Sequence, residues 1–320
     1  MAEKKRAPRN KTITVTEEES KHLSKKVLAF NGESTLSVAD ILDKTILGDT
    51  VEVIKAIPDN TFDLIIIDPP YNLDKNFNGL AFKASDDDRY IEYVESWFQE
   101  VARTLKTNGS LYLCGDWKNT AALYMTMRKY LTVLNRITWQ REKGRGAKSN
   151  WKNAMEDIWF GVKDKKDYYF DAESVKQKRK VIAPYRVNGK PKDWEETEEG
   201  RFRFTYSSNF WDDISIPYWS MPENTDHPTQ KPEKLIAKLI LASSPENSIV
   251  LDPFLGSGTT SVVAKKLNRK YVGIECNKEY AIWAEKRLEG ADTDRSIQGY
   301  VDGVFWERNT VAQQKRAKKS

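Results

Sequence analysis

The fold is decided by residues 248–260, which read SIVLDPFLGSGTT. The first five residues predict a short buried strand, and the glycine turn behind it opens a helix expected from about Thr259 to Leu267. A second apolar run follows at residues 271–275, and helical spacing returns over residues 278–288. Strands that alternate with helices in this way are typical of a parallel α/β sheet.

The same alternation occurs in the first half of the chain. Residues 62–67 read FDLIII and run into Asp-Pro-Pro, which predicts a buried parallel strand stopped where proline withholds its backbone donor. Residues 90–105 carry apolar side chains at helical spacing, and the Asn-Gly pair at 108–109 is expected to end that helix before a strand over residues 110–114. We therefore expect an α/β fold with a Rossmann-like, doubly wound and mostly parallel sheet.

Composition excludes several classes of protein. Of the 320 residues, 39% are hydrophobic and 31% charged, which describes an ordinary globular chain. No run of eighteen apolar residues is present, so no membrane association is expected, and the setting expected is the reducing cytoplasm. Cys114 and Cys276 lack metal-ligand spacing and the chain holds two histidines, so no metal site is expected.

The net charge of +5 is unevenly distributed along the chain. The two ends, residues 1–11 and 315–319, hold nine basic residues and one acidic residue, which leaves 43 basic and 46 acidic residues between them. Residues 128–152 and 176–192 are nevertheless strongly basic, and six of the ten tryptophans lie in the middle third of the chain. This pattern suits a nucleic-acid surface, but a solvated face over an aromatic core would look the same.

The glycine turn indicates a ligand site. A strand that ends in Gly-Ser-Gly and opens a helix brings bare backbone N–H groups close to a polar ligand group. Glu275 lies 19 residues after Gly256, at the end of the next predicted strand, where a carboxylate can accept hydrogen bonds from a ribose diol. A nucleoside-containing cofactor would explain this spacing, although a purely structural turn could share the two glycines.

Asp68-Pro69-Pro70-Tyr71 forms a second constellation, directly after the first predicted strand. The prolines withhold their donors, so this segment presents the Asp68 carboxylate and rigid carbonyl groups as acceptors. Two acceptors that hold the two hydrogens of a flat exocyclic –NH₂ group leave its nitrogen lone pair free to attack. Tyr71 can then lie against the ring that carries the amine.

With both motifs in one chain, the sequence resembles the DNA amino-methyltransferases that use S-adenosylmethionine. That family has a D/N/S-P-P-Y/F/W motif and an F-x-G-x-G motif at the ends of adjacent strands, and here the first precedes the second, as in the permuted β group. The segments at 46–49, 156–160 and 227–232 also match the family, so the resemblance covers roughly residues 44–165 and 225–290. It implies Asp68, Pro69, Pro70 and Tyr71 as catalytic residues. It implies S-adenosylmethionine as cofactor, held by Asp49, Asp68, Thr229, Lys231, Asp252, Phe254, Gly256, Ser257, Gly258, Thr259 and Glu275, with Lys231 neutralising the cofactor's carboxylate.

The resemblance also implies how the chain is divided. We expect a basic, partly disordered N-terminal extension (1–35), a catalytic half (36–165), a target-recognition insertion (166–224), a cofactor-binding half (225–295) and a C-terminal segment with a basic tail (296–320). Within the insertion, candidate contacts to DNA are Arg179, Lys180, Arg186, Arg201 and Arg203. The apolar stretch at 298–309 is expected to pack on the core. Residues 72–89 are expected to form either a loop that closes over a flipped base or a plain surface loop.

The resemblance predicts a site-specific enzyme that methylates adenine N6 in duplex DNA after flipping the base into its pocket. Aspartate as the first motif residue favours adenine, and cytosine N4 is the nearest alternative. A methyltransferase for structured RNA and a DNA-binding protein without turnover are the remaining alternatives. The partners implied are double-stranded DNA, a second copy of the chain as in many β-group relatives, and a cognate restriction endonuclease.

Overall fold

The computed structural model describes residues 7–32, 35–71, 75–77, 80–82, 87–141, 147–182, 184–198, 200–308 and 314–315. Half of the predicted loop at 72–89 and much of the two basic ends lie outside the described residues. Within the segment after the first motif, the structure describes a hairpin of β4 (Lys75–Phe77) and β5 (Leu80–Phe82).

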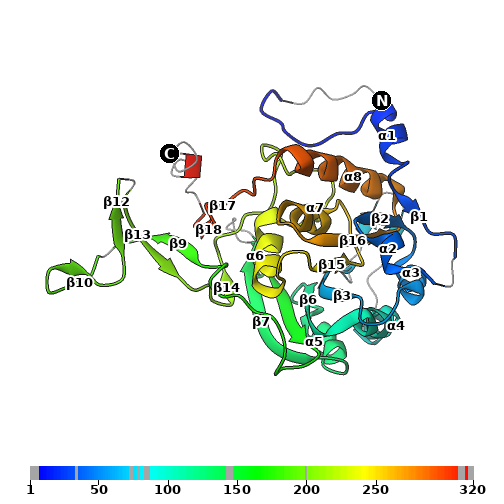
Figure 1. Cartoon of the computed structure of the whole chain (residues 1–320), viewed down its shortest axis with the longest axis horizontal. Helices are drawn as coiled ribbons and strands as arrows, with labels where there is room; N and C mark the ends of the chain where they lie inside the picture. The colour runs from blue at the N-terminus through cyan, green and yellow to red at the C-terminus, as the bar shows by residue number, and fades with distance from the viewer. Residues whose placement is uncertain are drawn as a thin grey trace.

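A mixed sheet forms the centre of the molecule (Figure 1). Within the described residues its strands are ordered β1 (Leu28–Ala29), β2 (Lys44–Leu47), β16 (Lys270–Glu275), β15 (Ile249–Asp252), β3 (Phe62–Ile67), β6 (Leu105–Gly115), β8 (Met155–Val162), β7 (Thr132–Gln140) and β14 (Phe210–Trp211). Pairing is parallel from β1 to β6, and β8 is antiparallel to both of its neighbours. The predicted doubly wound, mostly parallel α/β fold is confirmed.

Helices cover both faces of the sheet. The side chains of each buried strand therefore alternate between two cores, one on each face. Leu64 and Ile66 of β3 pack among residues of α6 (Glu233–Ser243), α7 (Thr259–Lys266) and α8 (Lys278–Thr293). Ile65 and Ile67 pack among residues of α3 (Thr50–Ala56), α4 (Asp87–Thr104) and α5 (Thr120–Met127). A strand that is apolar at consecutive positions is therefore explained by burial on both faces.

One boundary differs from the prediction. The Asn-Gly pair at 108–109 does not end a helix: α4 ends at Thr104, and β6 begins at once with Leu105. Leu105 pairs with Phe62 and Ser110 with Leu64, so the residues between them form an irregularity in the strand. A Cβ on Gly109 would lie 2.6 Å from Cδ1 of Leu105, so glycine fits this bulge for steric reasons.

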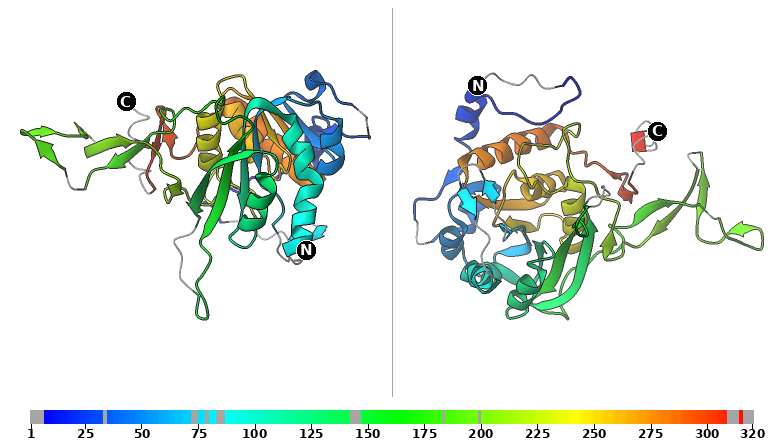
Figure 2. Two further views of the ribbon diagram at one scale, coloured as in Figure 1. Left: turned by 90° about the horizontal axis from the view of Figure 1, so that it is seen from below. Right: turned by 180° about the vertical axis from the view of Figure 1, so that it is seen from behind.

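A second, smaller sheet forms an arm that projects from the body (Figures 1 and 2). Its strands are β12 (Glu195–Thr197), β13 (Gly200–Thr205), β9 (Gln177–Lys180), β18 (Val304–Trp306) and β17 (Tyr300–Val301), and the hairpin of β10 (Arg186–Val187) and β11 (Lys190–Pro191) lies near its end. The predicted insertion supplies β9 to β13, while the C-terminal stretch supplies β17 and β18. Phe305 and Trp306 of that stretch are buried.

The N-terminal segment is attached to the body at several places. β1 pairs with β2 at the edge of the sheet, and Glu19 of α1 (Glu17–Leu23) forms an ion pair with Lys286 of α8. A short helix, α2 (Val38–Ile41), follows. Among the described residues, no helix has both the length and the apolar character needed to cross a bilayer.

Candidate active site

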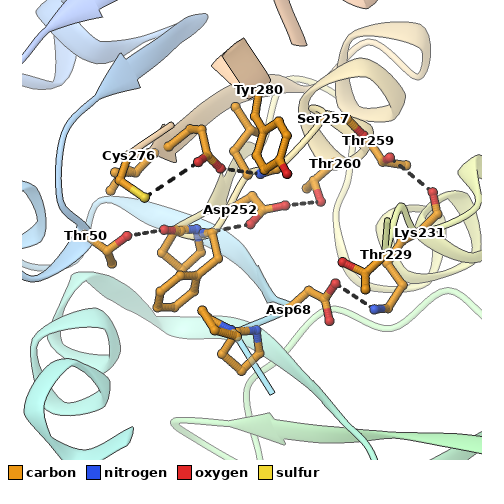
Figure 3. Close-up of a pocket in the computed structure, with 18 of the residues that line it drawn as sticks. Thr50, Asp68, Thr229, Lys231, Asp252, Ser257, Thr259, Thr260, Cys276 and Tyr280 are labelled. Atoms are coloured by element: carbon orange, nitrogen blue, oxygen red, sulfur yellow. Dashed lines mark hydrogen bonds and ion pairs between the residues drawn. The ribbon is translucent and has the colours of Figure 1, made fainter. Parts of the chain in front are cut away.

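Both sequence motifs meet at one cavity, because β3 and β15 are adjacent parallel strands and their carboxyl ends open at the same edge of the sheet (Figure 3). The four predicted catalytic residues all line it: Asp68, Pro69, Pro70 and Tyr71. So do all but one of the predicted cofactor residues, namely Asp49, Asp68, Thr229, Lys231, Asp252, Phe254, Gly256, Ser257, Thr259 and Glu275. Gly258 is the exception.

Glycine is required at the two positions of the turn for different structural reasons. Gly256 has φ 54°, and a Cβ there would lie 3.1 Å from Nε2 of His227 across the cavity. Gly258 has φ 86°, and a Cβ there would lie 2.6 Å from Cβ of Ala284, so glycine lets the start of α7 pack closely on α8. Gly256 thus keeps the cavity open, whereas Gly258 serves helix packing.

Two buried carboxylates shape the cofactor half of the cavity. Glu275 accepts hydrogen bonds from the backbone N–H groups of Gly256 (2.7 Å) and Asn277 (2.8 Å), and Asp252 accepts from Thr260 Oγ1 (2.6 Å) and the Phe254 N–H (3.0 Å). Burial raises the pKa of Glu275 to about 6 and that of Asp252 to about 7. Within the described residues, Oε2 of Glu275 and both oxygens of Asp252 accept one hydrogen bond each, so both groups can still accept from a ligand.

The rest of this half is apolar and suits an adenine ring. Phe254 packs edge-on against Trp97 at a centroid distance of 4.9 Å, and Ile274, Val51 and Tyr93 also line the cavity. Asp49 lies at the rim, where its side chain accepts a hydrogen bond from the N–H of Val51 (2.8 Å) and caps α3. Acidic groups beside an apolar wall fit S-adenosylmethionine, which carries a sulfonium, an ammonium and an adenosine.

The other half of the cavity is a network of hydrogen bonds around Asp68. Lys231 Nζ lies 2.6 Å from Oδ2 of Asp68, 3.1 Å from the Tyr71 hydroxyl and 3.3 Å from Oε2 of Glu156. The Tyr71 hydroxyl lies 2.9 Å from Oδ1 of Asp68 and 3.2 Å from Oε2 of Glu156. Oε1 of Glu156 is paired with Arg141 at 2.6 Å. The charges of the two carboxylates, Asp68 and Glu156, are therefore matched by those of the two cations, Lys231 and Arg141.

The network perturbs the ionisation of its members. Burial raises the pKa of Asp68, and the charge of Glu156 adds to this effect while Lys231 opposes it. Burial alone would lower the pKa of Lys231, but the carboxylates of Asp68 and Glu156 outweigh it and raise that pKa. Burial and the same two carboxylates hold the pKa of Tyr71 well above its ordinary value. Lys231 thus stays a cation and Tyr71 a neutral hydroxyl.

The ammonium group of Lys231 is bonded within the catalytic half of the cavity. The role that the resemblance implied for it, neutralising the cofactor's carboxylate, stays a prediction. Glu156 begins the segment at 156–160 that matches the family, but neither Glu156 nor Arg141 was predicted as a site residue. Glu156 lies near the start of β8, whose antiparallel pairing with β6 brings it beside Asp68, and nothing in the local sequence reveals that pairing.

All five predicted DNA contacts lie on the arm. Arg201 and Arg203 share one face of β13 by alternation, and Arg179 lies directly opposite Arg203 on β9. Arg186 and Arg201 lie 5.0 Å and 5.4 Å from the ring of Trp194. Lys180, opposite Phe202, lies on the other face of the sheet.

Three of these arginines, at 186, 201 and 203, form exposed ion pairs with Glu196 or Asp193 at 3.2 to 3.8 Å, while Arg179 donates to Oε1 of Gln177. Such pairs are weak in water, so phosphate groups can replace the carboxylates. Within the part of the chain that the structure describes, no group of three or more His, Cys, Asp or Glu side chains is arranged to hold a metal ion.

Comparison with known proteins shows the family of the chain. A family model described as DNA methylase matches residues 62–286. The chain is 38% identical over 255 residues to DNA adenine methyltransferase YhdJ of Escherichia coli (strain K12), covering 78% of this chain and 83% of that protein. It is 34% identical over 249 residues to Type II methyltransferase M.HpaI of Haemophilus parainfluenzae, covering 77% and 74%.

Two solved structures share the fold. The M1.HpyAVI–SAM complex has a TM-score of 0.52 at 24% identity and covers 76% of this chain and 98% of that one. The cytosine-N4-specific PvuII DNA methyltransferase has a TM-score of 0.54 at 16% identity, covering 79% and 92%. The chain therefore belongs to the DNA methylase family of N6 and N4 amino-methyltransferases, and it is a DNA methyltransferase that uses S-adenosylmethionine.

Proposed function

We propose that the protein methylates the N6 amine of an adenine in a short sequence of duplex DNA. The observation that carries the proposal is the Asp68 carboxylate beside the Pro69 carbonyl at the end of β3, on the border of the cofactor cavity. Aspartate in this motif favours adenine, and the relative with 38% identity is named a DNA adenine methyltransferase. Cytosine N4 carries an equivalent amine and is the competing target.

The predicted cofactor residues would contact different parts of S-adenosylmethionine. Glu275 would accept hydrogen bonds from the ribose diol, and Phe254 would contact the adenine ring of the cofactor. Asp252 and the turn that begins at Gly256 would surround its polar end. Asp49 and Thr229 line the same cavity and would complete the contacts. When bound, S-adenosylmethionine supplies an electrophilic methyl group.

The catalytic residues orient the amine. Asp68 and the Pro69 carbonyl would accept hydrogen bonds from its two N–H groups and leave the nitrogen lone pair directed at the methyl group. The nitrogen–carbon bond forms as the carbon–sulfur bond breaks, and the electron pair of that bond stays on sulfur. The amine becomes acidic only once it is methylated, so the proton leaves late, to Asp68 and then to water. Positioning of this kind can contribute up to ~7–11 kcal/mol to lowering the barrier.

Tyr71 must change partners during the reaction. Its hydroxyl lies 2.9 Å from Oδ1 of Asp68, the carboxylate that the amine needs. A base that enters the pocket therefore has to displace the hydroxyl, and the ring would then stack on the base. The preceding residue, Pro70, is held in place by Tyr90, whose hydroxyl donates a hydrogen bond to the Pro70 carbonyl at 3.3 Å.

The arm would bring DNA to the pocket. The arginines at 179, 186, 201 and 203 would contact phosphates or guanine edges, and Lys180 would contact a phosphate from the other face. Relatives named Type II methyltransferases, such as M.HpaI, favour a role in a restriction-modification system over a solitary one. A homodimer and a cognate endonuclease remain predictions of the family resemblance.

The test is to identify the methylated base. The purified protein is incubated with unmethylated plasmid DNA and S-adenosylmethionine, and the DNA is digested to nucleosides for mass spectrometry. We expect N6-methyladenine, and no product from Asp68→Ala, which should still bind DNA. N4-methylcytosine would overturn the choice of base. Comparable methylation of folded RNA would overturn the choice of nucleic acid, and no product despite cofactor binding would refute the proposal as a whole.

A further inference from the structure

Glu156 is a buried carboxylate that no motif assigns, and its two oxygens are bonded to three different side chains. It is 4% exposed and lies at the second position of β8. Oε1 is paired with Arg141 at 2.6 Å, and Oε2 lies 3.3 Å from Lys231 Nζ and 3.2 Å from the Tyr71 hydroxyl. Both partners of Oε2 also bond Asp68. Glu156 and Asp68 thus compete for the same two donors.

Lys231 and Tyr71 have a limited number of protons to donate. The Lys231 ammonium group has three protons, and its three neighbours within 3.3 Å are Asp68, Tyr71 and Glu156. The Tyr71 hydroxyl has one proton, which can go to Asp68 or to Glu156 but not to both. Any change in how strongly Glu156 holds these donors therefore changes how strongly Asp68 is bonded.

Arg141 determines how strongly Glu156 competes. Its guanidinium group is paired with the oxygen of Glu156 that faces away from Lys231, and its side chain is 32% exposed. Arg141 is therefore a counter-ion that neutralises Glu156 from the rim of the site. With Arg141 in place, the attraction of Glu156 for Lys231 is reduced and Lys231 lies nearer to Asp68, at 2.6 Å against 3.3 Å.

We propose that Glu156 and Arg141 are positioning residues that set the charge and the free lone pairs of Asp68 by sharing Lys231 and Tyr71 with it. The proposal rests on the methyl-transfer function above, because it concerns the acceptor that the target amine requires. When the base displaces the Tyr71 hydroxyl from Asp68, Glu156 offers that hydroxyl a second acceptor 3.2 Å away. Lys231 meanwhile favours the charged form of Asp68, against the effect of burial on its pKa.

The charged and titratable groups that face Asp68 come from several elements. Among the described residues they are Lys231 before α6, Glu156 on β8, Tyr71 of its own motif, Tyr90 on α4, Cys114 on β6 and Asp252 on β15. Only Glu156 has an outer counter-ion at the rim in the described part of the chain, so it is the group whose influence can be altered from outside the cavity.

The experiment compares two substitutions on adjacent residues of β8. Glu156→Gln removes the charge beside Asp68, while Asp157→Asn removes an equal charge from the opposite face of the strand, where Asp157 bonds Thr138. The ionisation of Asp68 is followed in the free, full-length protein by NMR of ¹³C-labelled aspartate carboxyl groups. Its signal is assigned by its loss in Asp68→Asn, which separates it from Asp252.

Glu156→Gln should move the titration of Asp68 to lower pH by about one unit, because the charge of Glu156 raises that pKa. The acid limb of the methyl-transfer rate should move in the same direction. We also expect kcat to fall by about tenfold, with KM for S-adenosylmethionine within about twofold, because the acceptor is misplaced but the cofactor half is intact. Asp157→Asn should leave all of these unchanged.

Arg141→Gln gives the opposite shift and does not depend on the folding of Glu156→Gln. Without its counter-ion Glu156 attracts Lys231 away from Asp68, so Asp68 should titrate at higher pH, and Arg141→Lys should restore most of the original value. Shifts of the same sign in both variants, no shift in either, or an equal shift in Asp157→Asn would overturn the proposal. The NMR titration needs no DNA, so absent methylation by the wild-type protein would count against the proposed function alone.

Discussion

Asp213 offers the sharpest test of how the arm is joined to the catalytic body. Its carboxylate lies 2.5 Å from Lys234 Nζ and 3.1 Å from Lys238 Nζ. The side chains of Asp213, Lys234 and Lys238 are 5%, 8% and 1% exposed, so one buried anion is paired with two buried cations. Lys238 also lies over the rings of Trp211 and Phe305 at 4.9 Å and 5.5 Å. The cluster therefore connects α6 with the end of the insertion and with β18.

Asp213→Asn should lower the free energy of unfolding by ~3–5 kcal/mol, because removal of one partner leaves uncompensated buried charge. That is a large share of the ~5–15 kcal/mol that typically stabilises a folded chain. The matched control is Asp212→Asn, which removes the same charge from the neighbouring, less buried residue and should cost below ~1 kcal/mol. Urea denaturation of both variants measures the difference.

The pH dependence of stability provides a second measurement of the same cluster. Burial lowers the pKa of Lys238 to about 8, below the ordinary value of 10.5 that the unfolded chain retains. The unfolded state therefore holds more protons between these values, and stability should rise with pH across this interval. In Asp213→Asn the rise should begin at a lower pH, because Lys238 has lost the anion that supports its charge.

The cluster lies outside the cofactor cavity, so Asp213→Asn should retain affinity for S-adenosylmethionine and lose affinity for DNA as the arm loosens. Equal stability of the Asp213→Asn and Asp212→Asn proteins would refute the charge argument. Loss of cofactor and DNA binding together would refute the separation of body and arm.

Four further predictions concern the cavity and the arm. Lys231→Met removes the cation beside Asp68, so the acid limb of the methyl-transfer rate should move to higher pH; an unchanged limb would contradict the ion-pair argument. The pKa of Asp252 is about 7, so calorimetric affinity for the cationic cofactor should weaken as pH falls from 8 to 6, and Asp252→Asn should flatten this dependence. Gly258→Ala should cost ~1–3 kcal/mol in urea denaturation through the clash behind the turn. Trp194 is buried beneath Arg186 and Arg201, so Trp194→Ala should weaken DNA binding several-fold in fluorescence anisotropy at constant salt and leave cofactor binding intact. Equal DNA affinity would refute a role of the ring in positioning these arginines.

The parts of the site that follow strand ends could be predicted from sequence. Asp68 and Gly256 each come directly after an apolar strand, and parallel strands bring such positions to one edge of the sheet. Glu156 could not be found in this way, because its place depends on the antiparallel return of β8 beside β6. The partner of Lys231 was unpredictable for the same reason, since several acidic groups lie within reach once the strands are assembled.

The arm could not be predicted from sequence, because it is built from two segments that lie far apart in the chain. Phe202 of the insertion is 1% exposed, and the residues that bury it are Trp306 and Val301 of the C-terminal strands. Neither segment has a core of its own, which explains why the insertion lacks clear periodicity and why the C-terminal stretch is apolar. Because side chains alternate across a strand, covering the Phe202 face leaves Arg201 and Arg203 on the other face. The C-terminal strands therefore support the proposed DNA-binding face without contributing a residue to it.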